Sequence, residues 1–182
     1  MVEDRIGYRY AKSLFDLAET QGSLEAVRQD MEMISTTGKQ NADFRAFLSS
    51  PLINAFKKAT VLEALFGGQY ASTLTRDLVQ MLARKSRERY LTQVAAAFLF
   101  LYDEKNQIHR GVLTSAVPLT QETADAIISV MGKTTGGRVE VEQRVDPSLI
   151  GGFVLKIGDQ LFDGSVAASL RRMKQALSQR TV

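Results

Sequence analysis

The sequence contains no cysteine and a single histidine, His109. Without cysteine the chain can form no disulfide and has no thiol chemistry, which fits a reducing compartment. A histidine-based metal site or a Ser-His-Asp triad would depend entirely on His109, and no supporting constellation accompanies it. We therefore predict a protein that is not an enzyme and that carries no metal and no cofactor.

Long hydrophobic runs are also missing. The longest, residues 94–102, has nine residues, whereas a helix needs roughly 20 to cross a bilayer. The first ten residues, MVEDRIGYRY, lack the basic-then-apolar order of a signal peptide and are too acidic for a transit peptide. We therefore expect any membrane association to be indirect, through partners.

Charge is not concentrated in one part of the chain. The net charge is +3, with 14 Lys/Arg and 13 Asp/Glu in residues 1–105, and 9 and 7 in residues 106–182. This even spread gives no basic arm and no acidic tail. The chain does have hydrophobic residues, which make up 45% of its 182 positions and are enough for one or two folded cores.

Helical periodicity dominates residues 1–105. Apolar residues recur at intervals of three and four, between glycines, prolines and residues that cap helices. This pattern predicts about six helices with short links, as in a compact bundle. The expected caps at helix starts are Ser23, Asn54 and Ser72, and the expected ends are Gly22, Gly38 and Gly67-Gly68.

The apolar faces of two of these helices allow more than one interpretation. Tyr10, Ser13, Leu14 and Leu17 lie on or beside the stripe of the first helix, and core positions are the favoured reading. The helix that follows Ser72 is apolar over more than one face. Such a helix either lies centrally in the bundle or offers a groove to a partner helix, and the composition leaves both open.

The pattern changes near Asn106. Residues 110–117 and 139–145 read as strands, and Thr120 can cap a helix between them. The stretch 150–177 then holds a strand, a Gly158-Asp159 hairpin turn, a shorter strand and a helix that starts at Ser165. The predicted fold class is α+β, with an all-α bundle at 1–105 and a small C-terminal α/β domain with a β-hairpin and terminal helix at 106–182.

Three motifs have a functional and a plain structural reading. Gly132-Lys133-Thr134 lacks the glycine five positions earlier that a phosphate-binding loop requires, and it ends a helix. Asp159 and Asp163 lack the calcium-loop pattern and read as turn residues. The cluster Arg84, Lys85, Arg87 and Arg89 reads as a solvated helix end; nucleic-acid binding would call for interleaved aromatic residues, which it lacks.

Both ends of the chain resemble one known family. At the N-terminal end this is residues 10–18 (YAKSLFDLA); at the C-terminal end it is residues 139–146, 150–153 (IGGF), 156–159 (KIGD) and 163–166 (DGSV). These stretches resemble the delta subunit of bacterial and chloroplast ATP synthases, the oligomycin-sensitivity-conferring protein of mitochondria. Of this C-terminal signature we single out a set that we interpret as structural: Gly151, Gly152, Phe153, Asp159, Asp163, Gly164 and Ser165.

The resemblance implies binding sites in both domains. The bundle would receive the N-terminal helix of an ATP synthase alpha subunit between its first and fifth helices, and the second domain would bind the peripheral-stalk b subunits. The groove residues carried over are Tyr10, Ser13, Leu14, Leu78, Met81 and Leu82. The stalk contact would use the apolar face of the last helix, namely Val166, Leu170, Met173 and Leu177.

The function implied by the resemblance is that of a non-catalytic stator connector. The protein would lie peripherally on the cytoplasmic face of a bacterial inner membrane, or on the matrix or stromal face in an organelle, and would bind no nucleic acid. The alternative, which composition alone leaves open, is a helical adaptor or a nucleic-acid-binding protein. Salt-dependent binding to DNA or RNA would favour that alternative.

Overall fold

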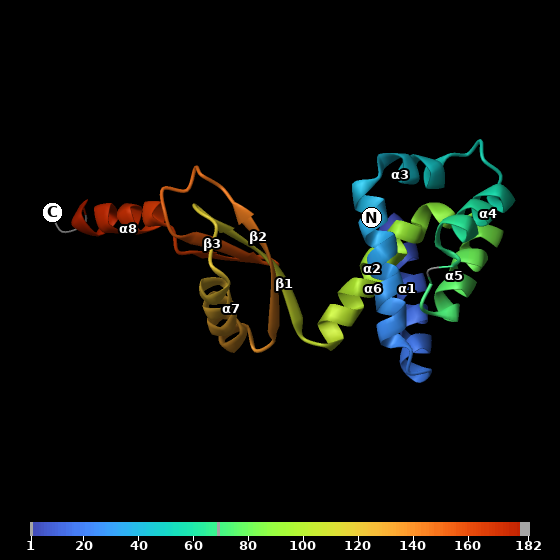
Figure 1. The fold of residues 1–182 in the computed structure, drawn as a ribbon, viewed down its shortest axis with the longest axis horizontal. Coiled ribbons are helices and arrows are strands. Elements are labelled where there is room, and N and C mark those ends of the chain that lie inside the picture. The colour runs from blue at the N-terminus through green and yellow to red at the C-terminus, as the bar shows by residue number, and fades with distance from the viewer. Residues whose placement is uncertain (1, 69, 179–182) are drawn as a thin grey trace. The chain divides into compact units, whose positions relative to one another are not determined.

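The computed structural model describes residues 2–68 and 70–178 (Figure 1). It divides into two compact units, Met1–Asp103 and Glu104–Val182. The first unit is helical and the second holds a four-stranded sheet with two helices. The predicted α+β class, with helices first and a small sheet after them, is confirmed.

The helical unit is a bundle whose core is built around α6. One side of α6 is buried, and the Val94, Ala95 and Phe98 side chains have no exposed surface. The Phe98 ring meets the Phe15 ring of α1 at a centroid distance of 5.6 Å. The elements are α1 (Val2–Thr20), α2 (Leu24–Gln40), α3 (Ala42–Ser49), α4 (Ala55–Phe66), α5 (Thr73–Arg84), a 3-10 turn η1 (Glu88–Tyr90) and α6 (Leu91–Lys105).

Most predicted helix boundaries in this unit are found. The side chains of Asn54 and Ser72 accept hydrogen bonds from the first-turn amides of α4 and α5, which satisfies donors that the helix itself leaves open. Gly22 has φ +66° and ends α1. There the amide of Ser23 donates to the Ala18 carbonyl and that of Gly22 to the Glu19 carbonyl, which is the Schellman arrangement.

Two boundary predictions are wrong. Ser23 occupies the position before α2, but its hydroxyl makes no capping hydrogen bond. Gly38 does not end α2, which continues to Gln40. Gly38 is buried in the helix, where an added Cβ would lie 2.5 Å from a methyl carbon of Thr92 on α6. It therefore serves close helix packing, and Arg45 binds the last carbonyls of α2 instead.

Buried polar groups connect segments of the bundle that are distant in sequence. The Asp30 carboxylate accepts hydrogen bonds from the amides of Ala71 and Ser72, at 2.8 and 3.1 Å, just before α5. The Lys58 ammonium contacts Glu88 on η1 and the Leu48 carbonyl at the end of α3, both at 2.8 Å. These contacts fix η1 and the start of α5, and α5 carries part of the surface described below.

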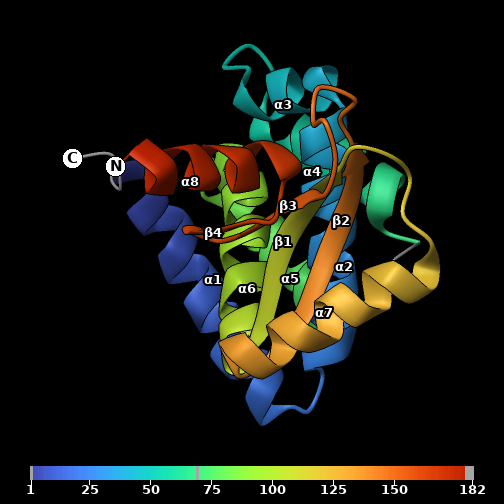
Figure 2. The ribbon, with the colours of Figure 1, turned by 90° about the vertical axis from the view of Figure 1, so that its left-hand side faces the viewer.

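The second unit is a mixed sheet with strand order β2-β1-β3-β4, seen side by side in Figure 2. β1 and β2 are parallel and joined through α7, whereas β3 pairs antiparallel with both β1 and β4. The Thr120 cap of α7 is present, and β1 begins two residues earlier than expected. The elements are β1 (Ile108–Ser115), α7 (Gln121–Thr135), β2 (Arg138–Val145), β3 (Phe153–Ile157), β4 (Gln160–Asp163) and α8 (Val166–Ser178).

Only one face of this sheet packs against α7. Leu113, Val139, Leu155 and Ile157 form the buried core, with half-buried side chains of α7 against them. Alternation along the strands puts charged residues on the opposite face. Ion pairs such as Arg110–Glu140, at 3.4 Å, lie there.

Candidate partner-binding surfaces

The six residues predicted for a groove between the first and fifth helices lie on helices that pack beside each other. The structure separates them by depth. Leu14, Leu78 and Leu82 are buried in the bundle core, with 4%, 6% and 1% of their surface exposed. Tyr10 and Met81 are half-buried and Ser13 is exposed. We call the accessible residues Tyr10, Ser13 and Met81, with the three leucines beneath them, the α1–α5 surface.

Tyr10 is held in place by Arg87. The guanidinium donates a hydrogen bond of 2.7 Å to the Tyr10 hydroxyl and lies 5.9 Å from the centre of the ring, within the range of a cation–π contact. Arg87 follows α5, so this contact ties the end of α5 to the exposed side of α1. The sequence pattern gave no sign of it, because the two residues are 77 positions apart.

The chain reversal after α5 positions this arginine. Ser86 has φ +53°, a backbone conformation that is uncommon for residues other than glycine. The Ser86 amide donates to the Ala83 carbonyl and the Arg87 amide to the Leu82 carbonyl, so α5 ends in a Schellman motif. The left-handed residue turns the chain back, which lets Arg87 reach Tyr10.

The four cations of the basic cluster, Arg84, Lys85, Arg87 and Arg89, differ in their surroundings. Arg89 donates a hydrogen bond to the Tyr90 hydroxyl and lies 4.7 Å from the centre of that ring. Arg84 and Lys85 are exposed at the end of α5. Two of the four cations are thus bound to tyrosines of the bundle itself.

The prediction that the whole apolar stripe of α1 faces the core is wrong at Leu17. Leu17 is 52% exposed, one helical repeat of seven residues after the half-buried Tyr10. Ser13 lies between them, and its hydroxyl donates to the Arg9 carbonyl. The stripe therefore turns from the core at Leu14 to the surface at Leu17, and an apolar strip remains open to water.

The C-terminal signature residues form the junction between β3, β4 and the start of α8. Gly152 has φ +81°, and a Cβ there would lie 2.4 Å from the Gly164 carbonyl oxygen. The Gly164 amide donates to the Phe153 carbonyl. A side chain at Gly152 would separate these two segments, so the geometry requires glycine.

The remaining signature residues shape the turns. Gly158, before Asp159 in the hairpin turn, has φ +54°. The Ser165 hydroxyl accepts a 3.1 Å hydrogen bond from the Ala168 amide and caps α8. Hydrogen bonds from Ser165 to the Asp163 carboxylate lower the pKa of that carboxyl. Gly151 lies against Val166, whose methyl group would be 3.1 Å from a Cβ added there.

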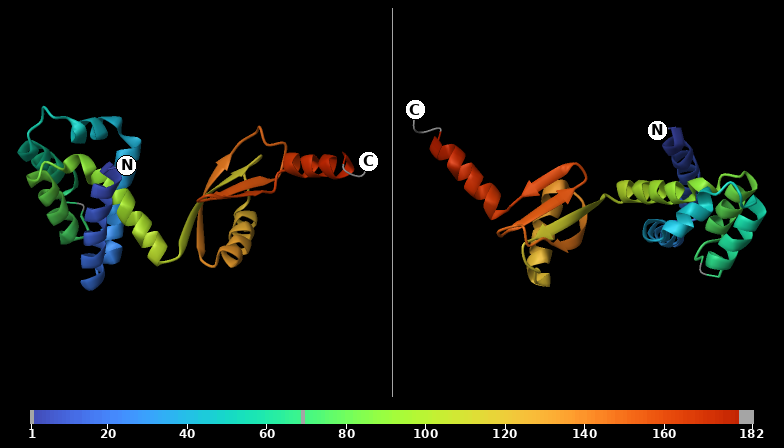
Figure 3. Two further views of the ribbon diagram at one scale, coloured as in Figure 1. Left: turned by 180° about the vertical axis from the view of Figure 1, so that it is seen from behind. Right: turned by 90° about the horizontal axis from the view of Figure 1, so that it is seen from above.

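Helix α8 presents an apolar face that its own unit does not cover. The exposed fractions of Val166, Leu170 and Met173 are 42%, 55% and 64%. These residues recur at helical spacing, so they lie on one side of α8. The helix extends away from the sheet (Figure 3). The side chain of Leu177, the fourth residue predicted for this face, lies outside the described residues.

The structure also bears on the phosphate-loop motif, on metal binding and on membrane spans. Gly132-Lys133-Thr134 lies inside the last turns of α7 and not in a loop after a strand. Within residues 2–68 and 70–178, no three His, Asp or Glu side chains gather where they could hold a metal ion. None of the helices described is long and apolar enough to cross a membrane.

Comparisons with known proteins identify the family of this chain. The family model described as ATP synthase delta (OSCP) subunit matches residues 6–177. The chain belongs to this family. An ATP synthase subunit delta of Cytophaga hutchinsonii is 36% identical over 182 residues, which cover 100% of this chain and 99% of that relative. One from Chlorobium luteolum is 36% identical over 170 residues, or 93% of each chain.

A solved structure extends the likeness to three dimensions. A chain in the mitochondrial ATP synthase hexamer of Toxoplasma gondii matches with a TM-score of 0.70 at 26% identity. The match covers 94% of this chain and 96% of that one. The match therefore includes both units of this chain. The predicted fold class and family are confirmed.

Proposed function

We propose that the chain is a non-catalytic connector in the stator of a proton-driven rotary ATP synthase. It would tie the catalytic head to the peripheral stalk. Torque from the rotor acts on the head, and a head held still converts rotation into conformational change at its catalytic sites. Family membership over residues 6–177 supports this role, and so does the presence of two folded units that each expose an apolar surface.

The helical unit would bind the head. In this proposal the N-terminal helix of an alpha subunit lies on the α1–α5 surface and contacts Tyr10, Ser13 and Met81. Leu14, Leu78 and Leu82 support that surface from below, since they are buried. Small Ser13 allows close approach of a helix, and the Tyr10 ring, fixed by Arg87, gives an aromatic anchor of the kind that dominates binding energy in interfaces.

The second unit would bind the b subunits of the stalk through α8. Its exposed leucine and methionine side chains recur along one helix face, and such a face is suited to pack against another helix. An unpartnered apolar face of this kind commonly marks an interaction site. Attachment to the membrane would be indirect, on the cytoplasmic face of a bacterial inner membrane or the equivalent face in an organelle.

The observation that carries the proposal is the half-buried Tyr10, held by Arg87, in a member of this family. The test is calorimetric titration of the full chain into catalytic head complex stripped of its own copy of this subunit. We expect tight binding at one chain per head. Tyr10→Asp would place a charge in the apolar contact and weaken binding by about 100-fold or more, as for a hot-spot residue.

Asp16→Asn is the matched control, because Asp16 is exposed on α1 and is not assigned to the surface. It should bind as the unchanged chain does. A folded Tyr10→Asp variant with unchanged affinity would refute the α1–α5 assignment, and a chain that does not bind the head at all would refute the connector role.

A further inference from the structure

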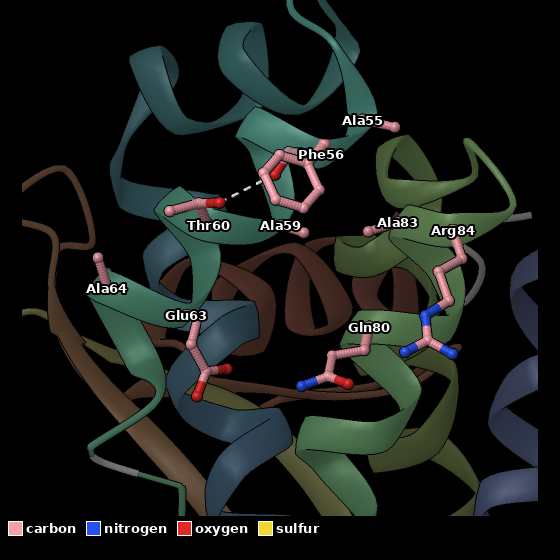
Figure 4. Close-up of a pocket in the computed structure, with 9 residues that line it drawn as sticks. All are labelled: Ala55, Phe56, Ala59, Thr60, Glu63, Ala64, Gln80, Ala83 and Arg84. Atoms are coloured by element: carbon pink, nitrogen blue, oxygen red, sulfur yellow. Dashed lines mark hydrogen bonds between the residues drawn. The ribbon is translucent and has the colours of Figure 1, made fainter.

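A groove lies in the helical unit, between α4 and α5 (Figure 4), with a volume of about 750 Å³. Met81, which belongs to the α1–α5 surface, is not among the residues that line it. The groove therefore uses another side of α5. The lining residues are Ala55, Phe56, Ala59, Thr60, Glu63 and Ala64 of α4, and Gln80, Ala83 and Arg84 of α5.

The groove is lined mainly by apolar side chains, with alanines of both helices at its floor. Alanines from both helices leave space where longer side chains would fill it. Phe56 stands at one end, 79% exposed, and the Thr60 hydroxyl donates to its carbonyl one turn away. An apolar partner that covers this exposed aromatic side chain and the alanines beside it would remove apolar surface from water, which lowers the free energy.

The lining contains one acidic and one basic side chain, and only the acidic one has an ion-pair partner among the described residues. Glu63 on the α4 wall is paired with Arg76 at 3.2 Å. Arg84 on the α5 wall is exposed, and no partner for its guanidinium is found among the described residues. Lys85 follows it, also exposed. Arg84 and Lys85 therefore give positive charge to the rim at the end of α5, and this part of the rim complements a carboxylate.

We propose that the α4–α5 groove binds an amphipathic helix of another subunit of the complex, one whose apolar side carries an acidic residue at its edge. The apolar stripe would lie on the alanines and against Phe56, and the carboxylate would pair with Arg84. The lining of α4 spans residues 55–64, about 15 Å of helix, so the contact is about three turns long. This site is separate from the α1–α5 surface.

The first test measures the affinity of the full chain for ATP synthase complex stripped of this subunit. Ala59→Glu puts a long charged side chain on the floor and should weaken binding about tenfold or more. Arg84→Glu reverses the charge of the rim and should weaken binding about threefold to tenfold, less so at high salt because salt screens the charge. Lys57→Glu is the control, because Lys57 is exposed on α4 and does not line the groove.

The second test identifies the occupant directly. A photo-crosslinking phenylalanine analogue replaces Thr60, or Lys57 as the control, in purified assembled complex. Crosslinking from position 60 to a helical segment that carries acidic residues, with none from position 57, supports the proposal. Crosslinking to a non-helical or basic segment, or yields equal at both positions, overturns it.

The failure of this inference is distinguishable from failure of the proposed function. If Ala59→Glu and Arg84→Glu bind as the unchanged chain while Tyr10→Asp does not, the α4–α5 site is wrong and the α1–α5 assignment stands. Arg84→Glu keeps the result interpretable if Ala59→Glu does not fold, because Arg84 is exposed and has no ion pair or hydrogen bond of its side chain within residues 2–68 and 70–178.

Discussion

Lys58 is a cation enclosed in the helical unit, with 4% of its side chain exposed, and Glu88 beside it has 7%. The Lys58 ammonium also binds the Leu48 carbonyl. Removing one partner of a buried pair leaves an uncompensated charge. We therefore expect Lys58→Met to reduce the free energy of unfolding by about 3–5 kcal/mol in a urea titration.

The double variant Lys58→Met, Glu88→Leu removes both charges and should recover much of that loss. A change below about 0.5 kcal/mol for Lys58→Met alone would mean that the pair is open to water in solution.

At the residue scale, the sequence predicts the local contacts and misses the distant ones. The caps Asn54, Ser72 and Thr120 each bond to an amide two or three residues away, so their chemistry is visible in a short window. Asp30 and Ala71 are 41 residues apart, and Arg87 bonds to Tyr10 across 77 positions. Only the folded chain brings such pairs together.

At the element scale, Glu25 on α2 joins that helix to α6. It pairs with Arg28 and accepts a 2.7 Å hydrogen bond from the Tyr102 hydroxyl. These contacts, that of Arg28 first, lower the pKa of the Glu25 carboxyl below its usual 4.5. A carboxyl with a lowered pKa stabilises the folded state above its unfolded pKa, and the effect is lost as the pH falls through the folded value.

We therefore expect Glu25→Gln to lower the free energy of unfolding by roughly 0.5 kcal/mol at neutral pH, because the pair is exposed and screened by water. The difference from the unchanged chain should vanish in acid, where Glu25 is protonated in both states. Urea titrations at a series of pH values measure this. A difference that grows as the pH falls would contradict the assignment.

Helix α8 gives a second prediction at this scale. Leu170 is 55% exposed, so Leu170→Lys should change the free energy of unfolding by less than about 0.5 kcal/mol. It should nevertheless abolish detectable binding to purified b subunits in a pull-down. Gln175→Lys, on the opposite side of α8, should leave that binding intact. Loss of binding in both variants would point to charge on α8, not to its apolar face, as the cause.

Element types and caps were largely predictable, but their packing was not. The hairpin was visible from the Gly158-Asp159 turn between apolar runs. The parallel pairing of β1 with β2 through α7 depends on contacts between strands about 30 residues apart. The prediction that Gly38 ends α2 fails because the sequence does not distinguish a glycine that ends a helix from one that permits close packing, here on Thr92.

At the scale of the whole molecule, the connector role requires one chain to hold two partners at once. The apolar stripe of α1 shows why periodicity alone does not separate surface from core positions, since Tyr10 and Leu14 belong to one periodic pattern but differ in exposure. The family and its two-part fold were predictable because residues that fix turns and caps, such as Gly152 and Ser165, can be recognised from a short stretch of sequence.

The most direct test of the connector role uses immobilised b subunits and catalytic head complex stripped of this subunit. The amount of head captured is measured as the full chain is titrated in. A bridging protein gives capture that rises and then falls, because excess chain occupies head and stalk separately. We predict this bell-shaped curve, and its loss with either Tyr10→Asp or Leu170→Lys. No capture at any concentration, with each partner shown to be intact, would contradict the account.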